Sequence, residues 1–221
     1  MKNIVLVHGA FVDGSTWRKV YELLTADGYH VAVVQIPTVS LHGDADMVRR
    51  AVEAQDGQSL LVGHSYGGAV ITEAGTRDNV AALVYIAAFV PDAGESVQAL
   101  GGDPSVPGSP ILSAPGDVFF QNRRTFHDSF GADLSAAEAM FLADSQVPWG
   151  MNAMTESVTV PAWRSKPCWY LVATEDHMIP LSAQRAMAQR AGAATQQVAA
   201  SHAVYLSQPR AVAAIIQQAC A

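Results

Sequence analysis

Residues 60–71 decide the fold, and they read Leu60-Leu61-Val62-Gly63-His64-Ser65-Tyr66-Gly67-Gly68-Ala69-Val70-Ile71. An apolar run typical of a buried strand leads into a serine between glycines, and an apolar helical run follows. This is the G-x-S-x-G pattern in the strand–turn–helix context that presents a nucleophile. We expect Ser65 to lie on a very sharp turn in a strained backbone conformation, with its hydroxyl projecting from the top of a sheet. Glycine at positions 63 and 67 agrees with such a turn, because a side chain at either position would collide with the neighbouring strand or helix.

Short apolar runs recur along the chain and are separated by helical patterns. The expected strands are residues 4–7, 30–36, 59–63, 80–89, 168–173 and 195–199. The first four of these runs are continuously apolar rather than alternating, as expected when helices cover both faces of a parallel sheet. The alternation of strands and helices favours right-handed βαβ units. The sequence therefore predicts an α/β fold over residues 1–221, with one doubly wound, mostly parallel sheet of about six strands.

The composition changes from Pro91 onward. Residues 91–116 are rich in Gly, Pro, Ser and Asp, and residues 118–163 carry many aromatic and Met side chains without a strand periodicity. We expect residues 91–166 to form an inserted helical cap that packs its own core, lines an apolar pocket, or does both. The side chains expected to bind substrate are Phe11, Phe119, Phe126 and Trp149.

A serine needs a base and an acid to become a good nucleophile. In this motif class the three residues follow the chain order Ser, acid, His. His202 fits the base because it lies between the last expected strand and the final helix. Asp176 fits the acid because it follows the strand at 168–173 and precedes the helix that starts at Pro180, with Glu175 as the rival candidate.

An oxyanion formed at a carbonyl needs two backbone N–H groups already aimed at it. One is expected from Tyr66, at the positive end of the helix that follows Ser65. The other is expected from the loop after the first strand, at Ala10, with Phe11 as the second choice. Gly9 lets the backbone of this loop turn inward.

The remaining histidines have simpler interpretations. His8 is expected to order the loop after the first strand, and His64 occupies a freely variable position of the G-x-S-x-G pattern. His42, Asp44 and Asp46 favour a helix-capping turn over a metal site, because a fourth ligand is missing. The sequence has no H-E-x-x-H motif and no paired C-x-x-C motif, so we expect neither a metal nor another cofactor.

Composition narrows the classes of partner. The chain of 221 residues has a net charge of −7, and its longest basic runs are the pairs 49–50 and 123–124, so we expect no binding to nucleic acid. Cys168 and Cys220 lie far apart, which predicts a reducing compartment and a cytoplasmic protein. The apolar runs are too short for a membrane span. The expected partner is a small-molecule ester, bound by a monomer or a homodimer.

Taken together, these residues resemble the α/β-hydrolase superfamily. More narrowly, the chain is similar to the small capped esterases related to plant methylesterases, hydroxynitrile lyases and bacterial pyrethroid-hydrolase-type esterases. The matching stretches are Leu6-Val7-His8-Gly9-Ala10, residues 61–68, residues 83–89, Asp176 with Pro180, and Ser201-His202. The resemblance covers nearly all of the chain outside the cap. It implies this fold, a Ser–His–Asp triad, and a pocket between the sheet and the cap.

The resemblance also distinguishes this chain from relatives of the same fold that catalyse other reactions. Haloalkane dehalogenases and epoxide hydrolases of this fold carry Asp where this chain has Ser65. The hydroxynitrile lyases carry Thr and Lys where this chain has Gly9 and Ala203. The expected function is therefore a serine carboxylic-ester hydrolase for small to medium apolar esters. The alternatives left open are a lyase, a cofactor-independent oxygenase or a C–C bond hydrolase on the same triad, and a non-catalytic ligand-binding protein.

Overall fold

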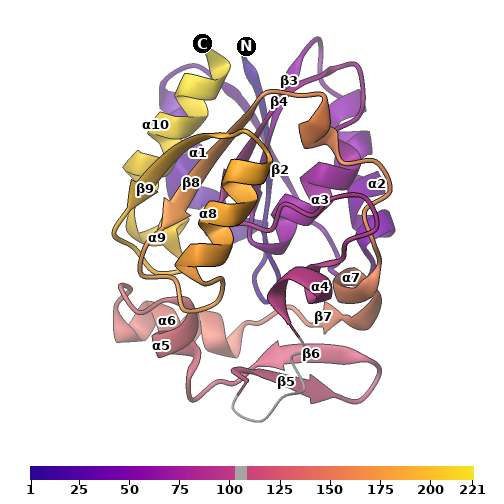
Figure 1. The fold of residues 1–221 in the computed structure, drawn as a ribbon. Coiled ribbons are helices and arrows are strands. Elements are labelled where there is room, and N and C mark those ends of the chain that lie inside the picture. Colours follow the sequence, from indigo (N-terminus) through magenta and orange to yellow (C-terminus); the bar gives the residue numbers. More distant parts are fainter. Residues whose placement is uncertain (103–108) are drawn as a thin grey trace.

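A six-stranded parallel sheet runs through the centre of the molecule, with helices on both faces (Figure 1). The structure is a computed structural model and describes residues 1–102 and 109–221. The sheet order is β2-β1-β3-β4-β8-β9, which confirms the predicted doubly wound sheet. The strands are β1 (Asn3–Val7), β2 (His30–Val34), β3 (Ser59–His64), β4 (Val80–Ile86), β8 (Cys168–Ala173) and β9 (Ala194–Val198).

Two groups of helices cover the sheet. One face carries α1 (Arg18–Ala26), preceded by the short 3-10 helix η1 (Gly14–Trp17), together with α9 (Val204–Ser207) and α10 (Pro209–Cys220). The other face carries α2 (Leu41–Glu53), α3 (Tyr66–Ala74) and α8 (Leu181–Arg190).

Alternate residues of each central strand enter different cores. Ile4 and Leu6 of β1 pack beneath α1 and α10, whereas Val5 and Val7 pack beneath α2 and α3. Because both sides of the strand are buried, the strand needs apolar residues at every position. This is why the central strands appear in the sequence as nearly continuous apolar runs, whereas the edge strand β9, which is partly exposed, contains Thr195, Gln196 and Gln197.

The order of the strands brings distant loops to one edge of the sheet. The chain passes from β1 to the outer strand β2 and then returns to the other side of β1 to form β3. The loops after β1 and β3 therefore flank a topological switch point, where ligands bind in folds of this kind. The loops after β8 and β9 leave from the same edge, since all these strands are parallel.

The segment between β4 and β8 mixes helices and strands, whereas the sequence predicts helices alone. Its helices are α4 (Val97–Gly101), α5 (Phe126–Phe130), α6 (Ala136–Asp144), α7 (Met151–Thr155) and the 3-10 helix η2 (Ala162–Arg164). A three-stranded antiparallel sheet is formed by β5 (Ile111–Ala114), β6 (Val118–Gln121) and β7 (Trp149–Gly150). These strands have only two to four residues, too few to show a periodicity. Residues 103–108 of the expected cap lie outside the described residues.

Glycines let α3 pack directly against the sheet. A Cβ atom on Gly63 would lie 2.4 Å from the carbonyl oxygen of Gly67. One on Gly67 would lie 2.6 Å from the carbonyl oxygens of Val7 and His8, at the end of β1. These contacts are with backbone, which cannot move aside as a flexible side chain would. Across the described residues, no helix is both long and apolar enough to cross a membrane.

We expect Gly67→Ala to lower the free energy of unfolding by about 3 kcal/mol, because the added methyl group overlaps the end of β1. Gly57→Ala is the matched control. Its added Cβ meets nothing within 4 Å, although the residue has φ +86°, so it should cost only about 1 kcal/mol for the backbone conformation. Urea denaturation measures both values, and equal losses would contradict the packing argument.

Candidate active site

Ser65 lies at the tip of the turn between β3 and α3. Its backbone has φ 53° and ψ −123°, a region that residues with side chains rarely occupy. Two hydrogen bonds fix this geometry, because the Ser65 carbonyl oxygen accepts from the backbone N–H of Gly68 at 3.0 Å and of Phe89 at 3.1 Å. The serine lines a cavity at the carboxyl edge of the sheet.

Asp176 and His202 form a buried pair beside this turn. Nδ1 of His202 donates to Oδ2 of Asp176 at 2.8 Å, and both side chains are almost fully buried. The carboxylate also accepts from the backbone N–H groups of Met178 at 2.7 Å and Ile179 at 3.0 Å. Because a carboxylate only accepts, the imidazole proton lies on Nδ1 and Nε2 keeps its lone pair.

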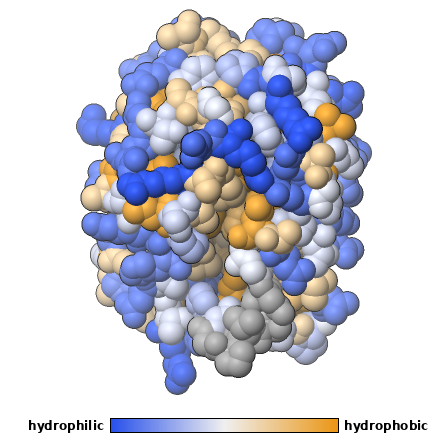
Figure 2. Space-filling view, viewed as in Figure 1, coloured by the Kyte–Doolittle hydropathy of each residue, from blue (hydrophilic) through white to orange (hydrophobic). Residues whose placement is uncertain are grey.

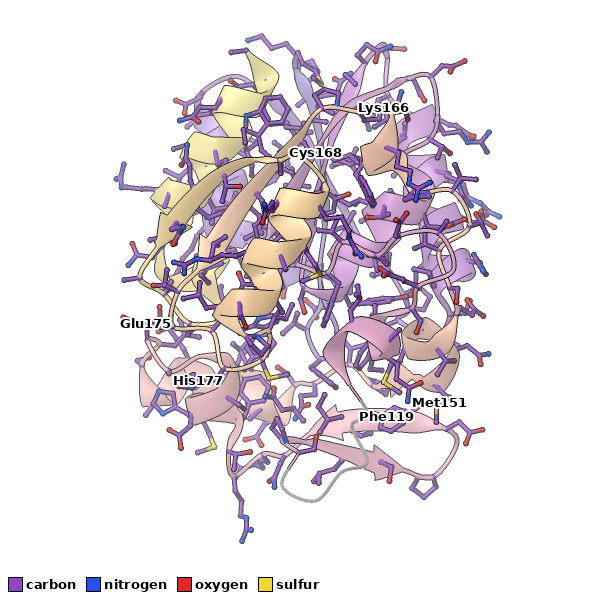
Figure 3. All side chains as sticks on the ribbon, viewed as in Figure 1. Phe119, Met151, Lys166, Cys168, Glu175 and His177 are labelled. Carbon is purple, nitrogen blue, oxygen red and sulfur yellow. The ribbon has the colours of Figure 1, made fainter. Side chains whose placement is uncertain are left out.

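Glu175, the alternative candidate for the acid, forms no hydrogen bond with His202 among the described residues. Glu175 is exposed, and Figure 3 shows its label at the edge of the molecule in the loop after β8. Asp176 is therefore the acid that the structure brings to His202. In the part of the chain that the structure describes, the His202 ring and the Ser65 hydroxyl are not hydrogen-bonded to each other. Contacts of this type often tighten only when substrate is bound.

A fully buried glutamine supports the acid. Nε2 of Gln184, on α8, donates to Oδ2 of Asp176 at 3.0 Å and to the Ile179 carbonyl at 2.8 Å. Its Oε1 accepts from the backbone N–H of Ala173 at 3.1 Å. Sequence reasoning missed this residue. The available signal was a polar residue at a helix position that faces the sheet.

His64 supports the loop that carries His202. It is fully buried, and its Nε2 donates to the His202 carbonyl at 2.9 Å, with the two rings 4.7 Å apart. Burial holds the pKa of His64 well below its usual value, so the ring is neutral. The position is variable in the motif, yet here the side chain links the turn at Ser65 to the loop after β9.

The segment around α5 holds the same loop from the other side. The backbone N–H of Ala203 donates to the Phe130 carbonyl at 2.9 Å. Oδ2 of Asp133 accepts from the Ser201 backbone N–H at 3.1 Å, and its Oδ1 accepts from the Ser201 hydroxyl. The loop carrying His202 is thus fixed by both the sheet domain and the segment between β4 and β8.

His8 orders the loop after β1. Its Nε2 accepts from the Ile36 backbone N–H at 3.1 Å, so the proton lies on Nδ1, which donates to the Gly9 carbonyl at 2.9 Å. Burial lowers the pKa of His8, which keeps the ring neutral. In this loop Phe11 has φ 68°, and Ala10 lines the cavity together with Ser65 and Tyr66. The two predicted oxyanion residues therefore border the same cavity as the serine.

The cavity has a volume of about 260 Å³. Phe11 and Trp149, two of the side chains expected to bind substrate, line it, with their rings 5.6 Å apart in an edge-to-face arrangement. Figure 2 shows a hollow with hydrophobic surface on this face, between α4 and the loop after β8, both of which contribute to the lining. Other lining side chains were not among the residues expected to bind substrate, and they include Phe89, Val97, Gln98, Ile111, Met154, His177, Met178 and Ile179.

Phe119 and Phe126 do not line this cavity. Phe119, labelled in Figure 3, is buried in the core that includes Trp149. Phe126 stacks on Phe130 at 4.9 Å in a separate small core. Phe119 packs within the main core and Phe126 within a small core formed mostly by the segment between β4 and β8, so these two members of the predicted substrate-binding set do not line the cavity.

The run at residues 42–46 is divided between the surface and the interior. Asp46 is exposed and pairs with Arg49, whereas Asp44 is fully buried. The N-cap of α2 is Ser40, whose side chain accepts from the Gly43 N–H, so neither aspartate caps the helix as the sequence suggested. Among the described residues, no group of three or more His, Cys, Asp or Glu could hold a metal ion.

Comparisons with known proteins agree with this architecture. A family model described as the alpha/beta hydrolase family matches residues 4–215. A pyrethroid hydrolase of Sphingobium wenxiniae is 30% identical over 251 aligned positions, which cover 97% of this chain and 86% of that protein. A carbendazim hydrolyzing esterase of Nocardioides is 38% identical over 116 residues, covering 45% of this chain and 47% of that protein. The crystal structure of polyneuridine aldehyde esterase superposes with a TM-score of 0.82 at 18% identity, covering 100% of both chains.

The neutral state of His64 predicts how stability changes with pH. Below its usual pKa of 6.5 the unfolded chain binds a proton at His64 and the folded protein does not, so acid favours unfolding. This group should remove about 1.4 kcal/mol of unfolding free energy per pH unit between about pH 6.5 and 5. His64→Gln, which can still donate to the His202 carbonyl, should reduce the slope by that amount in urea denaturation.

The exposed His30 provides the control, since His30→Gln should leave the slope unchanged. An unaltered slope in His64→Gln would show that His64 is protonated in the folded protein.

Proposed function

The chain belongs to the alpha/beta hydrolase family, and from that premise we propose that it is a serine carboxylic-ester hydrolase. The observation that carries the proposal is the strained Ser65 at the cavity, with the buried His202–Asp176 pair joined to the same turn through His64. The names of the relatives support ester hydrolysis, because they include esterases and a pyrethroid hydrolase.

In the proposed reaction the Ser65 hydroxyl oxygen attacks the ester carbonyl carbon while Nε2 of His202 takes the hydroxyl proton. Asp176 holds the imidazole in the required tautomer and stabilises the imidazolium that forms. The negative charge on the former carbonyl oxygen is held by the backbone N–H groups of Tyr66 and Ala10. Collapse of this intermediate breaks the ester bond, and His202 returns its proton to the departing alcohol.

Water then completes the cycle. His202 takes a proton from a water molecule, the resulting hydroxide attacks the acyl-enzyme, and the acid leaves as Ser65 regains its proton. The substrate we propose is a small to medium apolar ester, because most of the side chains around the cavity of about 260 Å³ are apolar. Gly9 and Ala203 stand where the related hydroxynitrile lyases carry Thr and Lys, which favours hydrolysis over cyanide elimination.

We expect a fluorophosphonate probe to label Ser65 at neutral pH, as located by mass spectrometry of the digested protein. Ser65→Ala should abolish labelling and lower the rate of 4-nitrophenyl acetate hydrolysis at least about 10⁴-fold. Equal rates in the two proteins would place the chemistry elsewhere. Binding of an ester without turnover or labelling would favour a non-catalytic protein.

We expect Asp176→Asn to lower kcat about 10⁴-fold, because an amide facing Nδ1 favours the tautomer in which Nε2 carries the proton and cannot act as base. Glu175→Gln is the matched control, and it should leave kcat unchanged because Glu175 is exposed. Steady-state kinetics on the two variants test the assignment. A larger loss in Glu175→Gln would make Glu175 the acid.

A further inference from the structure

We propose that Asp44 is a positioning residue that holds both the oxyanion residue Tyr66 and the cavity wall at Trp149 in place. This inference rests on the proposed function, since it concerns the same reaction. Asp44 lies in the first turn of α2 and is fully buried. Neither the triad nor the oxyanion N–H groups include it, yet it contacts the elements that carry them.

The carboxylate of Asp44 is held by neutral donors. Its Oδ2 accepts from the Tyr66 hydroxyl at 2.5 Å, and its Oδ1 accepts from the Thr38 backbone N–H at 3.1 Å. Glu156, which acts on it through space, has the same sign, and burial raises the pKa of Asp44 to about 6. Burying a carboxyl group in this way is costly. An apolar side chain could fill the space that Asp44 occupies without this cost. The presence of a carboxyl group therefore points to a role for its two hydrogen bonds.

The first hydrogen bond fixes the residue next to the nucleophile. Tyr66 directly follows the strained Ser65, and its side chain is fully buried. Its backbone is anchored in the first turn of α3, and the bond to Asp44 anchors the far end of the ring. With both ends fixed, Tyr66, which lines the cavity, has little freedom to move, and neither does its N–H, the proposed oxyanion donor. Donors that are aimed in advance are what stabilise an oxyanion.

The second hydrogen bond reaches the cavity wall. Thr38 has φ 56°, and the bond from its N–H to Asp44 holds this left-handed conformation. The Thr38 hydroxyl donates to the Pro148 carbonyl at 2.7 Å, and its own carbonyl accepts from the Gly150 N–H at 2.8 Å. These two residues flank Trp149, whose ring lies 5.8 Å from that of Tyr66. One carboxylate therefore sets the wall and the oxyanion residue relative to each other.

The test compares substitutions at Asp44 with the same substitutions at Asp46, which is exposed on the same helix. Asp44→Leu removes both hydrogen bonds, and we expect kcat for a 4-nitrophenyl ester to fall about 10-fold to 100-fold, below the loss of about 10²–10³ for deleting one oxyanion donor. KM should change less than about threefold, because the donor acts mainly in the transition state. Asp46→Leu should leave both constants unchanged.

Asp44→Asn should keep kcat within about threefold of wild type, since its amide can accept from the Thr38 N–H and donate to the Tyr66 oxygen. This rescue separates hydrogen-bond positioning from a need for charge. The rate of fluorophosphonate labelling should fall in parallel with kcat in Asp44→Leu, because the phosphonyl oxygen uses the same N–H groups. If Asp44→Leu does not fold, Tyr66→Phe carries the test, with kcat expected about tenfold lower and KM unchanged.

A wild-type kcat in folded Asp44→Leu or Tyr66→Phe would overturn the proposal, as would an equal loss in Asp44→Asn and Asp44→Leu. Loss of kcat in Asp46→Leu to the same degree would also overturn it. Failure of the proposed function is read from a different variant. Full activity in Ser65→Ala would reject the serine hydrolase, whereas loss of activity there together with unaffected Asp44 variants would reject the positioning role alone.

Discussion

The strained backbone of Ser65 is the constraint on which the rest of the site depends. A residue with a side chain at φ 53° and ψ −123° costs about 1–3 kcal/mol and persists only where its surroundings hold it there. Here they do so through the close approach of α3 to β1 and β3, which the glycines at 63 and 67 permit. The same approach places the N-terminus of α3 at the cavity, so one turn of chain positions both the serine and the backbone N–H that we propose as an oxyanion donor.

The main sheet could be predicted from the sequence, and the segment between β4 and β8 could not. Both faces of the central strands are covered, so every position must be apolar and each strand appears as an uninterrupted run. β6 has only four residues, and its two buried positions, Phe119 and Gln121, include a polar one. Aromatic residues in an insertion can fill its own core or line a pocket. Composition does not distinguish between these two roles. Phe126, for example, was expected to bind substrate but packs in a small core.

Within the site, predictability follows the topology. Residues that follow parallel strands reach a common edge, so the sequence could predict that the loops carrying Ala10, Ser65, Asp176 and His202 lie together. Gln184 was harder to select, because it contacts Asp176 from a helix and its signal was only a polar residue at a helix position that faces the sheet. The contact of His64 with the loop after β9 likewise depends on a spatial neighbour 138 positions away.

The loop carrying His202 is anchored by Phe130 and Asp133, which lie in the segment between β4 and β8. This segment therefore does more than shape the pocket. A chimera that grafted the corresponding segment of a relative, in order to alter substrate range, would remove two anchors of the histidine loop unless residues 130–133 or their equivalents were retained. Point substitutions along the cavity wall would leave both of these anchors in place.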